Sequence, residues 1–527
     1  MTSLAEDLMR PEAYPRPFPG AVELRETHVS WVFLTEGDVY KVKKPVRFAF
    51  LDFSTVEARR RACEAEVLLN ERLAAGTYLG VVPVRRGADG RCHVGPEGEV
   101  VDWAVHMIRL PDVFRADERV RAGTLTGAHV DAIASAIASF HARVGAGPEV
   151  ARAGSITALE ANIEENFAEV DPIADDLSSR EQLEAIQQWQ LDFLRTRARV
   201  FERRRAEGRI RDGHGDLRLD HVYVGDDGEL TIVDCIEFDP RFRHGDVCAD
   251  IAFLSMDLAN AGRFDLAERF LARYARAADD YELYALVDFY ESYRAFVRGK
   301  ISAIAARHAV GPARAEAILS ARRHFALALA VSRRSMLTPL VVAVGGVIAS
   351  GKSTVADALA ARMAAPIVDA DRTRKYLLGL GHTTHDVSGA FEGPYSQAMT
   401  DRVYAEVMLR ASTVLESGRP VVIDASFRTE DMRRAARDLA HEHGVPFLMI
   451  ECRVPSDVCR ARLRERERVV SVSDGRLEIL DAFVARMEPM NELPESERLV
   501  VDTTRPVEES VREIERRLEL WPEGLVA

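Results

Sequence analysis

The stretch HGDLRLDHVYV, residues 214–224, places two carboxylates and two histidines just before a short β-branched run. The run VYV, the turn GDDG and the run ELTIV predict a β-hairpin over residues 222–233. Such a hairpin would gather four side chains at its open end: Asp216, Asp220, His221 and Asp234. Carboxylates gathered in this way repel one another unless a divalent cation or a proton lies between them. The pattern therefore predicts a metal–phosphate site.

A second motif, GGVIASGKST at residues 345–354, fits the spacing GxxxxGK[ST]. It follows an apolar run and opens a helical one, which is the setting that a phosphate-binding loop requires. Glycines let the backbone wrap around phosphates, and the N–H groups at the start of the helix point at the anion. The residues predicted to bind the nucleotide are Gly346, Gly351, Lys352, Ser353 and Thr354. Lys352 is expected to reach the outer phosphates, and Ser353 is expected to ligate magnesium.

Carboxylates also end two of the apolar runs that follow this loop. Asp369 and Asp371 follow one run, and Asp424 ends another. Because the carboxyl ends of parallel strands meet at the crevice where ligands bind, these side chains are candidates for magnesium and substrate binding. An aspartate at a strand end can also be a simple helix cap. The arginines of CRARLRERER can likewise form only solvated ion pairs with neighbouring glutamates.

The elements that would position these residues can be read from the hydrophobic pattern. Residues 22–47 alternate like strands and end in VYKVKKPV, and residues 54–75 are predicted to form a helix capped by Ser54. Residues 126–335 are predicted to be mainly helical apart from the hairpin. After a boundary at about residue 337, apolar runs alternate with helical segments, which predicts a parallel sheet with helices on both faces.

The first half resembles the aminoglycoside and choline-type phosphotransferases, which share the protein-kinase fold. Their catalytic segment reads HGDxxxxN, followed by a short hairpin and an aspartate, and three residues match its start: His214, Gly215 and Asp216. By this resemblance Asp216 accepts the proton of the substrate hydroxyl, and Asp234 holds magnesium against the β- and γ-phosphates. The family's second metal ligand is an asparagine, where this chain has His221. Either one metal suffices, or Asp220 replaces the asparagine, or the site is impaired.

The same resemblance assigns roles to residues on either side of this segment. Lys41 in VYKVKK would grip the α- and β-phosphates, with Lys43 as the alternative and Lys44 pointing away. Glu66 would be the partner of the lysine, with Glu64 as the second choice. The strand WAVHMIRLP would meet adenine. Two further aspartates, Asp246 and Asp250, would brace the catalytic loop, whereas Glu237 and Asp239 are either metal or substrate groups or merely solvated.

The second half resembles the P-loop small-molecule kinases of the gluconate kinase and zeta-toxin type over residues 338–520. By that resemblance Asp371 is the substrate-side carboxylate and Arg372 is a substrate contact. Arg462 and Arg466 would be lid arginines over the phosphate that is transferred.

Composition narrows the class of protein. The chain of 527 residues is 47% hydrophobic and 29% charged, as is usual for a globular protein of several domains. A formal charge of −14 argues against nucleic acid as a partner. The six cysteines form no CxxC pair, the first residues do not resemble a signal segment, and no apolar run is long enough to cross a membrane. We therefore expect a cytoplasmic protein with no membrane partner, and its oligomeric state stays open.

Taken together, these features predict an α+β kinase-like domain with two lobes, residues 1–112 and 113–336, followed by an α/β P-loop domain with a parallel sheet, residues 338–527. Both domains are expected to use ATP with Mg²⁺ to phosphorylate a small polar metabolite, such as a sugar, an amino-sugar or an aminoglycoside. The chain passes from the hairpin into the helical residues 249–262 without an APE-like element, which disfavours a protein kinase. One alternative is a nucleotide-binding regulatory protein with a pseudokinase first half and an ATPase second half. Another is an ATPase coupled to a binding partner.

Overall fold

The computed structural model describes residues 3–16, 18–48, 51–170, 180–331, 338–381, 384, 391–466 and 475–518. The chain divides into two units. Unit 1 comprises Met1–Gly262 and Val297–Ala321, and unit 2 comprises Arg263–Phe296 and Arg322–Ala527. The domain boundary predicted near residue 337 falls outside the described residues, so it stays a prediction.

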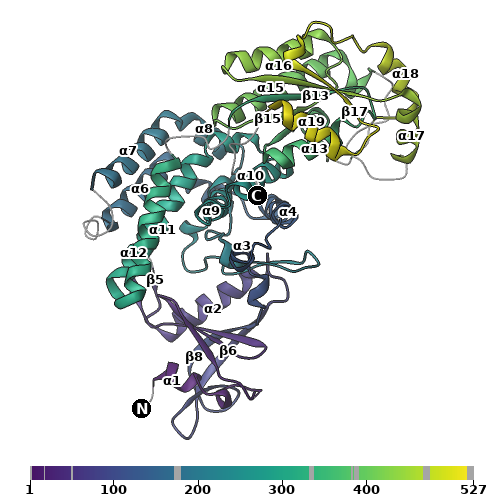
Figure 1. Ribbon diagram of the computed structural model, residues 1–527. Coiled ribbons are helices and arrows are strands. Elements are labelled where there is room, and N and C mark those ends of the chain that lie inside the picture. The colour runs from purple at the N-terminus through teal and green to yellow at the C-terminus, as the bar shows by residue number, and fades with distance from the viewer. Residues whose placement is uncertain are drawn as a thin grey trace. The chain divides into compact units, whose positions relative to one another are not determined.

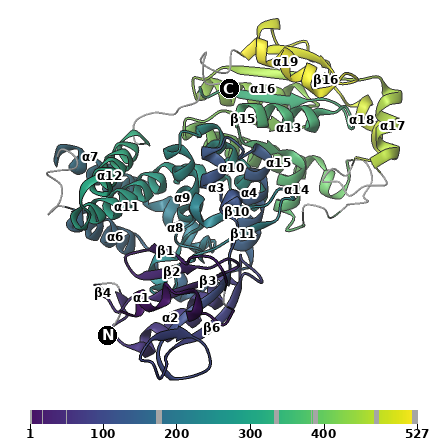
Figure 2. The ribbon, with the colours of Figure 1, turned by 60° about the horizontal axis from the view of Figure 1, so that its bottom comes forward.

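Unit 1 begins with a six-stranded antiparallel sheet in the order β1-β2-β3-β8-β6-β7. Its strands are β1 (Glu23–Glu26), β2 (Ser30–Leu34), β3 (Asp38–Lys43), β8 (Glu99–Ile108), β6 (Tyr78–Arg86) and β7 (Cys92–Val94). One face packs on the N-terminal residues through Tyr40 and Val42. The helix α2 (Val56–Asn70) lies along β6 and β8 on the other face (Figures 1 and 2). Because side chains alternate along β3, Lys41 and Lys43 point to the side of α2.

The predicted helix at 54–75 exists, but its start differs from the prediction. Thr55 is the N-cap, because its side chain accepts a hydrogen bond from the backbone N–H of Ala58. Ser54, the expected cap, instead donates its hydroxyl to Asp52. Serine and threonine are both good caps, so adjacent candidates cannot be separated from sequence.

The rest of unit 1 is mainly helical, as predicted, and carries the hairpin. Its helices include α3 (Ala116–Arg121), α4 (Gly127–Arg143), α5 (Pro148–Arg152), α6 (Ile156–Val170), α7 (Arg180–Thr196), α8 (Ala198–Ala206) and α9 (Val247–Asn260). The hairpin joins β10 (Val222–Val224) to β11 (Leu230–Ile232), with Val222 opposite Ile232. A second short pair joins β9 (Ile210–Asp212) to β12 (His244–Asp246). These two pairs hold the loop that contains HGD.

Unit 2 contains the predicted parallel sheet, with five strands in the order β14-β15-β13-β16-β17. The strands are β13 (Val341–Gly345), β14 (Ile367–Asp369), β15 (Val421–Asp424), β16 (Phe447–Arg453) and β17 (Arg498–Asp502). All five residues of β13 are buried, which explains an apolar run without alternation. The helices α13 (Lys352–Met363) and α19 (Val507–Leu518) cover one face, and α15 (Gln397–Glu416) and α16 (Glu430–Glu442) cover the other (Figure 1).

The remaining described elements of unit 2 lie around this sheet. They are the helices α14 (Ala370–Leu377), α17 (Ser456–Arg466), α18 (Leu477–Ala485) and α10 (Phe264–Ala278), and the 3-10 helices η6 (Tyr281–Ala285), η7 (Gly393–Tyr395) and η8 (Glu495–Glu497). The helices α11 (Val287–His308) and α12 (Gly311–Val331) contribute residues to both units. The segment 263–296 therefore belongs to unit 2, although it precedes the P-loop strand by about 50 residues in sequence.

Candidate active sites

The first candidate site, in unit 1, is built around Lys41 of β3. Its Nζ donates to Glu66 Oε1 of α2 at 2.8 Å and to Asp234 Oδ1, just after β11, at 2.5 Å. Although burial opposes it, the carboxylates of Asp234 and Glu66 raise the pKa of Lys41 well above its ordinary value. A single charged lysine thus connects the sheet, the helix and the hairpin.

The neighbouring lysines have different surroundings. Lys43 donates to Glu66 Oε2 and to Glu237 Oε1, both at 2.5 Å, and its side chain is only 1% exposed. Glu237 is therefore part of a buried ion pair rather than a solvated group. Lys44 pairs with an exposed glutamate of β1, so it points away as predicted. Glu64 pairs with an arginine on the exposed side of α2. Lys41 is thus the member of this trio whose ammonium reaches Asp234.

The loop containing HGD is held by a carboxylate at the start of α9. Asp250 accepts hydrogen bonds from the backbone N–H of His214 at 2.6 Å and of Gly215 at 2.8 Å. Gly215 has φ +85°, and a Cβ there would lie 2.7 Å from the carbonyl oxygen of Phe242, so only glycine fits. Asp250 therefore braces the loop, as predicted. Asp246, the second predicted brace, instead binds the buried guanidinium of Arg204 through both carboxylate oxygens, each at 2.7 Å.

The structure brings the predicted acidic side chains together around His221. Its Nδ1 is 3.7 Å from Asp216 Oδ2, and its Nε2 is 3.5 Å from Asp234 Oδ2 and 4.0 Å from Asp220 Oδ1. Arg218, which the sequence had not singled out, pairs with Asp216 and with Asp220, each at 3.1 Å. Although burial opposes it, the guanidinium of Arg218 holds the pKa of Asp216 below its usual value.

These cations revise the electrostatic argument made from the sequence. The expected cluster of carboxylates exists, but Arg218 and Lys41 already neutralise much of its charge. His221 Nδ1 lies 2.9 Å from the carbonyl oxygen of Asp216, and its Nε2 lies 2.7 Å from an N–H of Arg218. The carbonyl must accept and the arginine must donate, so the ring carries its proton on Nδ1. The lone pair of Nε2 therefore faces an arginine, at the position where metal ligation was predicted.

The residues of this site nevertheless fit a bound magnesium ion in part. Within the described ranges, no group of three or more His, Cys, Asp or Glu side chains has a metal-binding arrangement. Asp234 keeps 41% of its side chain exposed, and Lys41 occupies only one of its two oxygens at short distance. One oxygen of the Asp234 carboxylate is thus accessible to magnesium. One carboxylate can suffice, because magnesium in such sites usually takes most of its other ligands from water and from the phosphates.

The second candidate site, in unit 2, is formed by the loop between β13 and α13. Gly346 has φ +150°, and a Cβ there would lie 2.6 Å from Ser350 Oγ and 2.7 Å from the carbonyl oxygen of Cys452. Gly351 has φ +88° and is the N-cap of α13, so Lys352 is the first residue of the helix. Both glycines thus permit a backbone that other residues adopt only with strain. The loop has the predicted setting between a buried strand and a helix.

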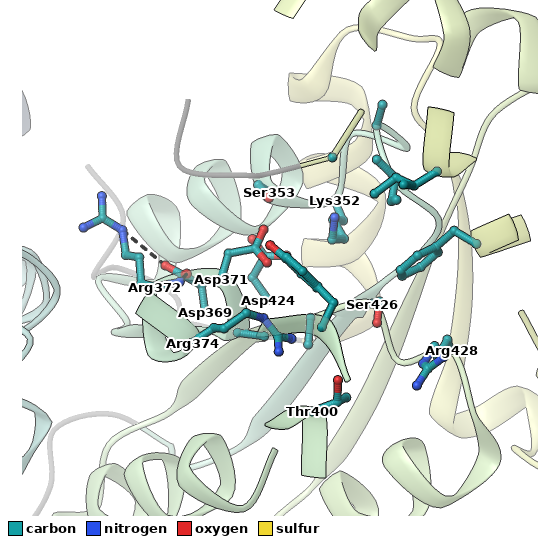
Figure 3. A pocket seen from close by; sticks show the side chains of 18 of the residues that line it. Lys352, Ser353, Asp369, Asp371, Arg372, Arg374, Thr400, Asp424, Ser426 and Arg428 are labelled. Carbon is teal, nitrogen blue, oxygen red and sulfur yellow. Dashed lines mark hydrogen bonds and ion pairs between the residues drawn. The ribbon is translucent and has the colours of Figure 1, made fainter. Parts of the chain in front are cut away.

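A cavity of about 350 Å³ lies beside this loop, a volume at the small end of ligand sites. Lys352, Ser353 and Thr354 line one side of it, together with Asp424 at the end of β15 and Asp371 in the first turn of α14. Figure 3 shows Lys352 and Ser353 on one side of Asp424, with Arg374 and Arg428 on the other. The predicted nucleotide-binding residues and acidic residues therefore share one cavity.

Asp424 and Ser353 form a donor set that suits magnesium. The Ser353 side chain hydrogen-bonds to Asp424, and burial, opposed by nearby Lys352, raises the pKa of Asp424 to about 6. Its Oδ1 has no hydrogen-bond partner among the described residues. A buried carboxylate oxygen without a partner is costly, so a bound cation would satisfy it. A hydroxyl and a strand-end carboxylate are also the ligands that P-loop enzymes offer to Mg²⁺.

Asp369 and Asp371 have different contacts at this edge of the sheet. Asp369 accepts a hydrogen bond from the backbone N–H of Arg372 at 2.6 Å, so it caps α14. The side chain of Arg372 folds back to Asp369, with Nε at 3.4 Å (Figure 3). Asp371 lines the cavity and its carboxylate has no ion-pair partner in the described part of the chain. Asp369 is thus both a helix cap and part of the cavity lining, whereas Asp371 lines the cavity without capping a helix.

Of the two predicted lid arginines, Arg462 is the one whose side chain the structure describes, and it does not line the cavity. Arg462 donates to the carbonyl oxygens of Ala349, at 3.2 Å, and of Thr503, at 2.6 Å. It therefore binds the backbone of the phosphate-binding loop, and it is not among the described residues that line the cavity. The side chain of Arg466 lies outside the described part of the structure. Arg476, at the start of α18, lines the cavity instead.

Two buried arginines of the cavity were missed by sequence reasoning. Arg374 stacks over Tyr395, with 4.5 Å from its guanidinium carbon to the ring centroid, and Arg428 stacks over Phe391 at 4.9 Å. Each is 6% exposed, and neither has an ion-pair partner within the described ranges. Arg374 follows Asp371 by three residues on a helix, a spacing that could have indicated a shared face. The sequence around Arg428 carries no such signal.

Comparisons with known proteins relate each half of the chain to a known family. Uncharacterized proteins of Mycobacterium tuberculosis and Mycobacterium bovis are each 35% identical to the chain over 475 residues, which are 90% of this chain and 92% of theirs. Residues 36–290 match the phosphotransferase enzyme family, and residues 341–490 match a family described as an AAA domain. The chain belongs to the family of these mycobacterial proteins. It joins a kinase-like phosphotransferase domain to a P-loop kinase domain, which confirms both resemblances and the predicted fold class.

Two solved structures are reported for comparison. An aminoglycoside 2'-phosphotransferase-IIIa is 16% identical, covers 62% of this chain and 99% of its own, and has a TM-score of 0.37. A gluconokinase from Sinorhizobium meliloti is 23% identical, covers 36% of this chain and 94% of its own, and has a TM-score of 0.26. Among the described residues, no helix is both long and apolar enough to span a membrane.

Proposed function

We propose that the chain is an ATP-dependent phosphotransferase with two nucleotide sites, each of which transfers a phosphoryl group to a hydroxyl of a small polar metabolite. The observation that carries this proposal is the same in each unit. A lysine and strand-end or hairpin carboxylates, from elements far apart in sequence, converge at one point: Lys41 with Asp234, and Lys352 with Asp424. Such a pairing of a phosphate-binding cation with a magnesium-binding carboxylate is what phosphoryl transfer requires.

In unit 1, the roles follow from the geometry around Asp216. Lys41, held by Glu66, would bind the phosphates of the nucleotide. Asp216 Oδ2 faces Arg218, so Oδ1 is the oxygen that would accept the proton of the acceptor hydroxyl. The lowered pKa of Asp216 keeps it ionised and ready to do so. Magnesium, when bound at Asp234, would neutralise charge on the β- and γ-phosphates.

In unit 2, the phosphate-binding loop would hold the triphosphate through its N–H groups and Lys352. Ser353 and Asp424 would hold magnesium, which supplies charge neutralisation at the phosphates. Asp371, which lines the cavity without an ion-pair partner among the described residues, would orient the acceptor hydroxyl and accept its proton. Catalysis would consist mainly of positioning and electrostatic stabilisation.

The lining of the second cavity favours an acceptor that carries a negative group. Arg374 and Arg428 are buried, and no described carboxylate pairs with either. Burial and the neighbouring Arg486 lower the pKa of Arg428, and nearby Tyr404 partly opposes this lowering. Unpaired buried cations are costly, and an anionic group on the substrate would offset that cost. Sugar acids and phosphorylated sugars therefore belong in an acceptor panel, beside neutral sugars and aminoglycosides.

A regulatory role is the second candidate, and one observation favours it. Arg218 pairs with Asp216 and faces His221, in the place where the related enzymes hold a second metal. A first unit weakened in this way would bind a ligand and report its state to an ATP-hydrolysing second unit, without transferring phosphate itself.

The test uses two variants of the full chain, Asp216→Asn and Lys352→Ala, with the acceptor panel and a measurement of ATP consumption. We expect each variant to abolish a separate acceptor-dependent turnover. Asp216→Asn removes a positioned base, which costs about 10²–10⁴ in rate, and Lys352→Ala removes the cation that would bind the phosphates at the other site. If Asp216→Asn leaves every turnover intact, the regulatory alternative is favoured. If neither variant changes any turnover, the proposal is wrong.

A further inference from the structure

The P-loop site includes a side chain from outside the P-loop domain as the sequence defines it. Residues 263–296 lie within the match to the phosphotransferase family, apart from their last six, and end before the P-loop match begins at residue 341. In the structure they nevertheless belong to unit 2. The helix α10 and the turn η6 of this segment contact β14 and α15 of the P-loop fold.

Buried polar contacts fix this segment to the elements around the cavity. The Tyr281 hydroxyl donates to the carbonyl oxygen of Ile367 in β14 at 2.5 Å. Arg410 of α15 donates to both oxygens of Asp279, at 2.8 and 3.0 Å, and its guanidinium stacks over Tyr281. Bidentate arginine–carboxylate pairs have a defined geometry, so the segment is held in one register against β14.

Arg276, on the last turn of α10, reaches the cavity itself. Its Nε lies 3.3 Å from Asp369 Oδ2, and its NH1 donates to Asp357 Oδ1. The side chain is 17% exposed and is part of the cavity lining. One guanidinium thus joins two carboxylates that belong to different parts of the site.

The two carboxylates connect the nucleotide side of the cavity to its acceptor side. Asp357 lies on α13, five residues after Lys352, so a single helix connects it to the phosphate-binding loop. Asp369 ends β14 and caps α14, the helix that carries Asp371 and Arg374 into the cavity. A side chain that binds both Asp357 and Asp369 would therefore fix the distance between the phosphate-binding loop and the acceptor-side groups on α14.

We propose that Arg276 is a positioning residue of the P-loop kinase site, which clamps α14 to α13 and so aligns the acceptor with the γ-phosphate. The P-loop site of this chain is therefore completed by a helix from the phosphotransferase part of the sequence. The guanidinium of Arg276 also offsets the repulsion between Asp369 and the nearby Asp371. This inference rests on the proposed kinase activity of unit 2.

The test compares Arg276→Gln with Arg276→Lys and with a matched control, Arg419→Gln, in the full chain. Arg419 is a buried arginine that binds the same segment, through Glu268 at 2.7 Å and Asp288 at 3.0 Å, but it is not among the described residues that line the cavity. The first measurement is Lys352-dependent turnover of MgATP with water as the acceptor, as kcat and KM. The second is hydrogen exchange of residues 370–377, with Tm recorded for every variant.

We expect Arg276→Gln to lower kcat by about 10- to 100-fold, the usual cost of losing a residue that orients a functional group, with KM for MgATP changed less than about threefold. Arg276→Lys should recover most of kcat because its ammonium keeps the charge. Exchange of α14 should be faster in Arg276→Gln than in Arg419→Gln. The control should lower Tm and leave kcat unchanged.

Two results would overturn the proposal. One is that Arg276→Gln behaves like Arg419→Gln, with a lower Tm and an unchanged kcat. The other is that KM for MgATP rises as much as kcat falls, which would make Arg276 a nucleotide contact. If the native chain has no Lys352-dependent turnover, the proposed function fails for unit 2, and hydrogen exchange of α14 then decides on the clamp alone.

Discussion

Acidification tests the hydrogen bonds that hold the HGD loop of unit 1, because the buried side chain of His214 belongs to this loop and makes two of them. The imidazole is 1% exposed. Its Nε2–H donates to the carbonyl oxygen of Val233 at 3.0 Å, and its Nδ1 accepts from the backbone N–H of Asp216 at 3.3 Å. Burial lowers the pKa of His214 from 6.5 to about 4, since a second ring proton would face an N–H donor in a dry environment.

The effect on stability follows from the two pKa values. Between pH 6.5 and 4 the unfolded chain binds a proton at His214 that the folded chain does not, so the free energy of unfolding falls as the pH falls. Each pH unit of that interval is worth about 1.4 kcal/mol, and the whole interval about 3 kcal/mol. Above pH 6.5 the stabilisation is fully present, because both states are then neutral at this residue.

The assay is urea unfolding of the native chain and of His214→Gln at several pH values, followed by tryptophan fluorescence. Three of the four tryptophans, Trp31, Trp103 and Trp189, belong to unit 1. The difference in stability between the two proteins should shrink by about 3 kcal/mol from pH 7 to pH 4. An exposed control, His308→Gln, should leave the pH dependence as it is in the native chain. A difference that stays constant with pH would refute the reasoning.

Three further predictions concern single side chains. Glu66→Gln should cost unit 1 about 3–5 kcal/mol, because it leaves two buried lysines without their shared carboxylate; an unchanged urea midpoint would contradict this. Gly346→Ala should abolish MgATP binding at the P-loop, since the added Cβ would lie 2.6 Å from Ser350 Oγ, and retained binding in a titration would count against the described loop. Asp424→Asn should lower the affinity of that site for magnesium by about 10- to 100-fold. A magnesium titration of the variant that matches that of the native chain would show that Asp424 is not a ligand.

The parts of the sites that could be predicted from sequence are those fixed by local structure. The turn GDDG sets the hairpin, and the hairpin alone brings Asp234 to His221. The alternation of a strand places Lys41 and Lys43 on one face, toward Glu66. The glycine spacing of the phosphate-binding loop likewise determines its backbone. In each case the contact depends on the period of one element or on a short turn.

The contacts that sequence reasoning missed depend on packing between distant segments. Nothing in the sequence of α10 distinguishes Arg276 from the other arginines of that helix, yet it lies 93 residues from the aspartate that it binds. Arg218 lies within the quoted HGD stretch, but its direction depends on the fold of the loop. Arg462 was expected over the phosphate because of the resemblance to P-loop small-molecule kinases. It binds the backbone carbonyl of Ala349 instead, a group that no side-chain pattern reveals.

The central claim, that one chain has two nucleotide sites, is tested most directly by counting bound nucleotides. Equilibrium binding of MgATP to the full chain should give two molecules per chain. Lys41→Ala and Lys352→Ala should each remove one of them and leave the other with its native affinity. A single nucleotide that is lost entirely in Lys352→Ala and unaffected by Lys41→Ala would contradict the account of unit 1.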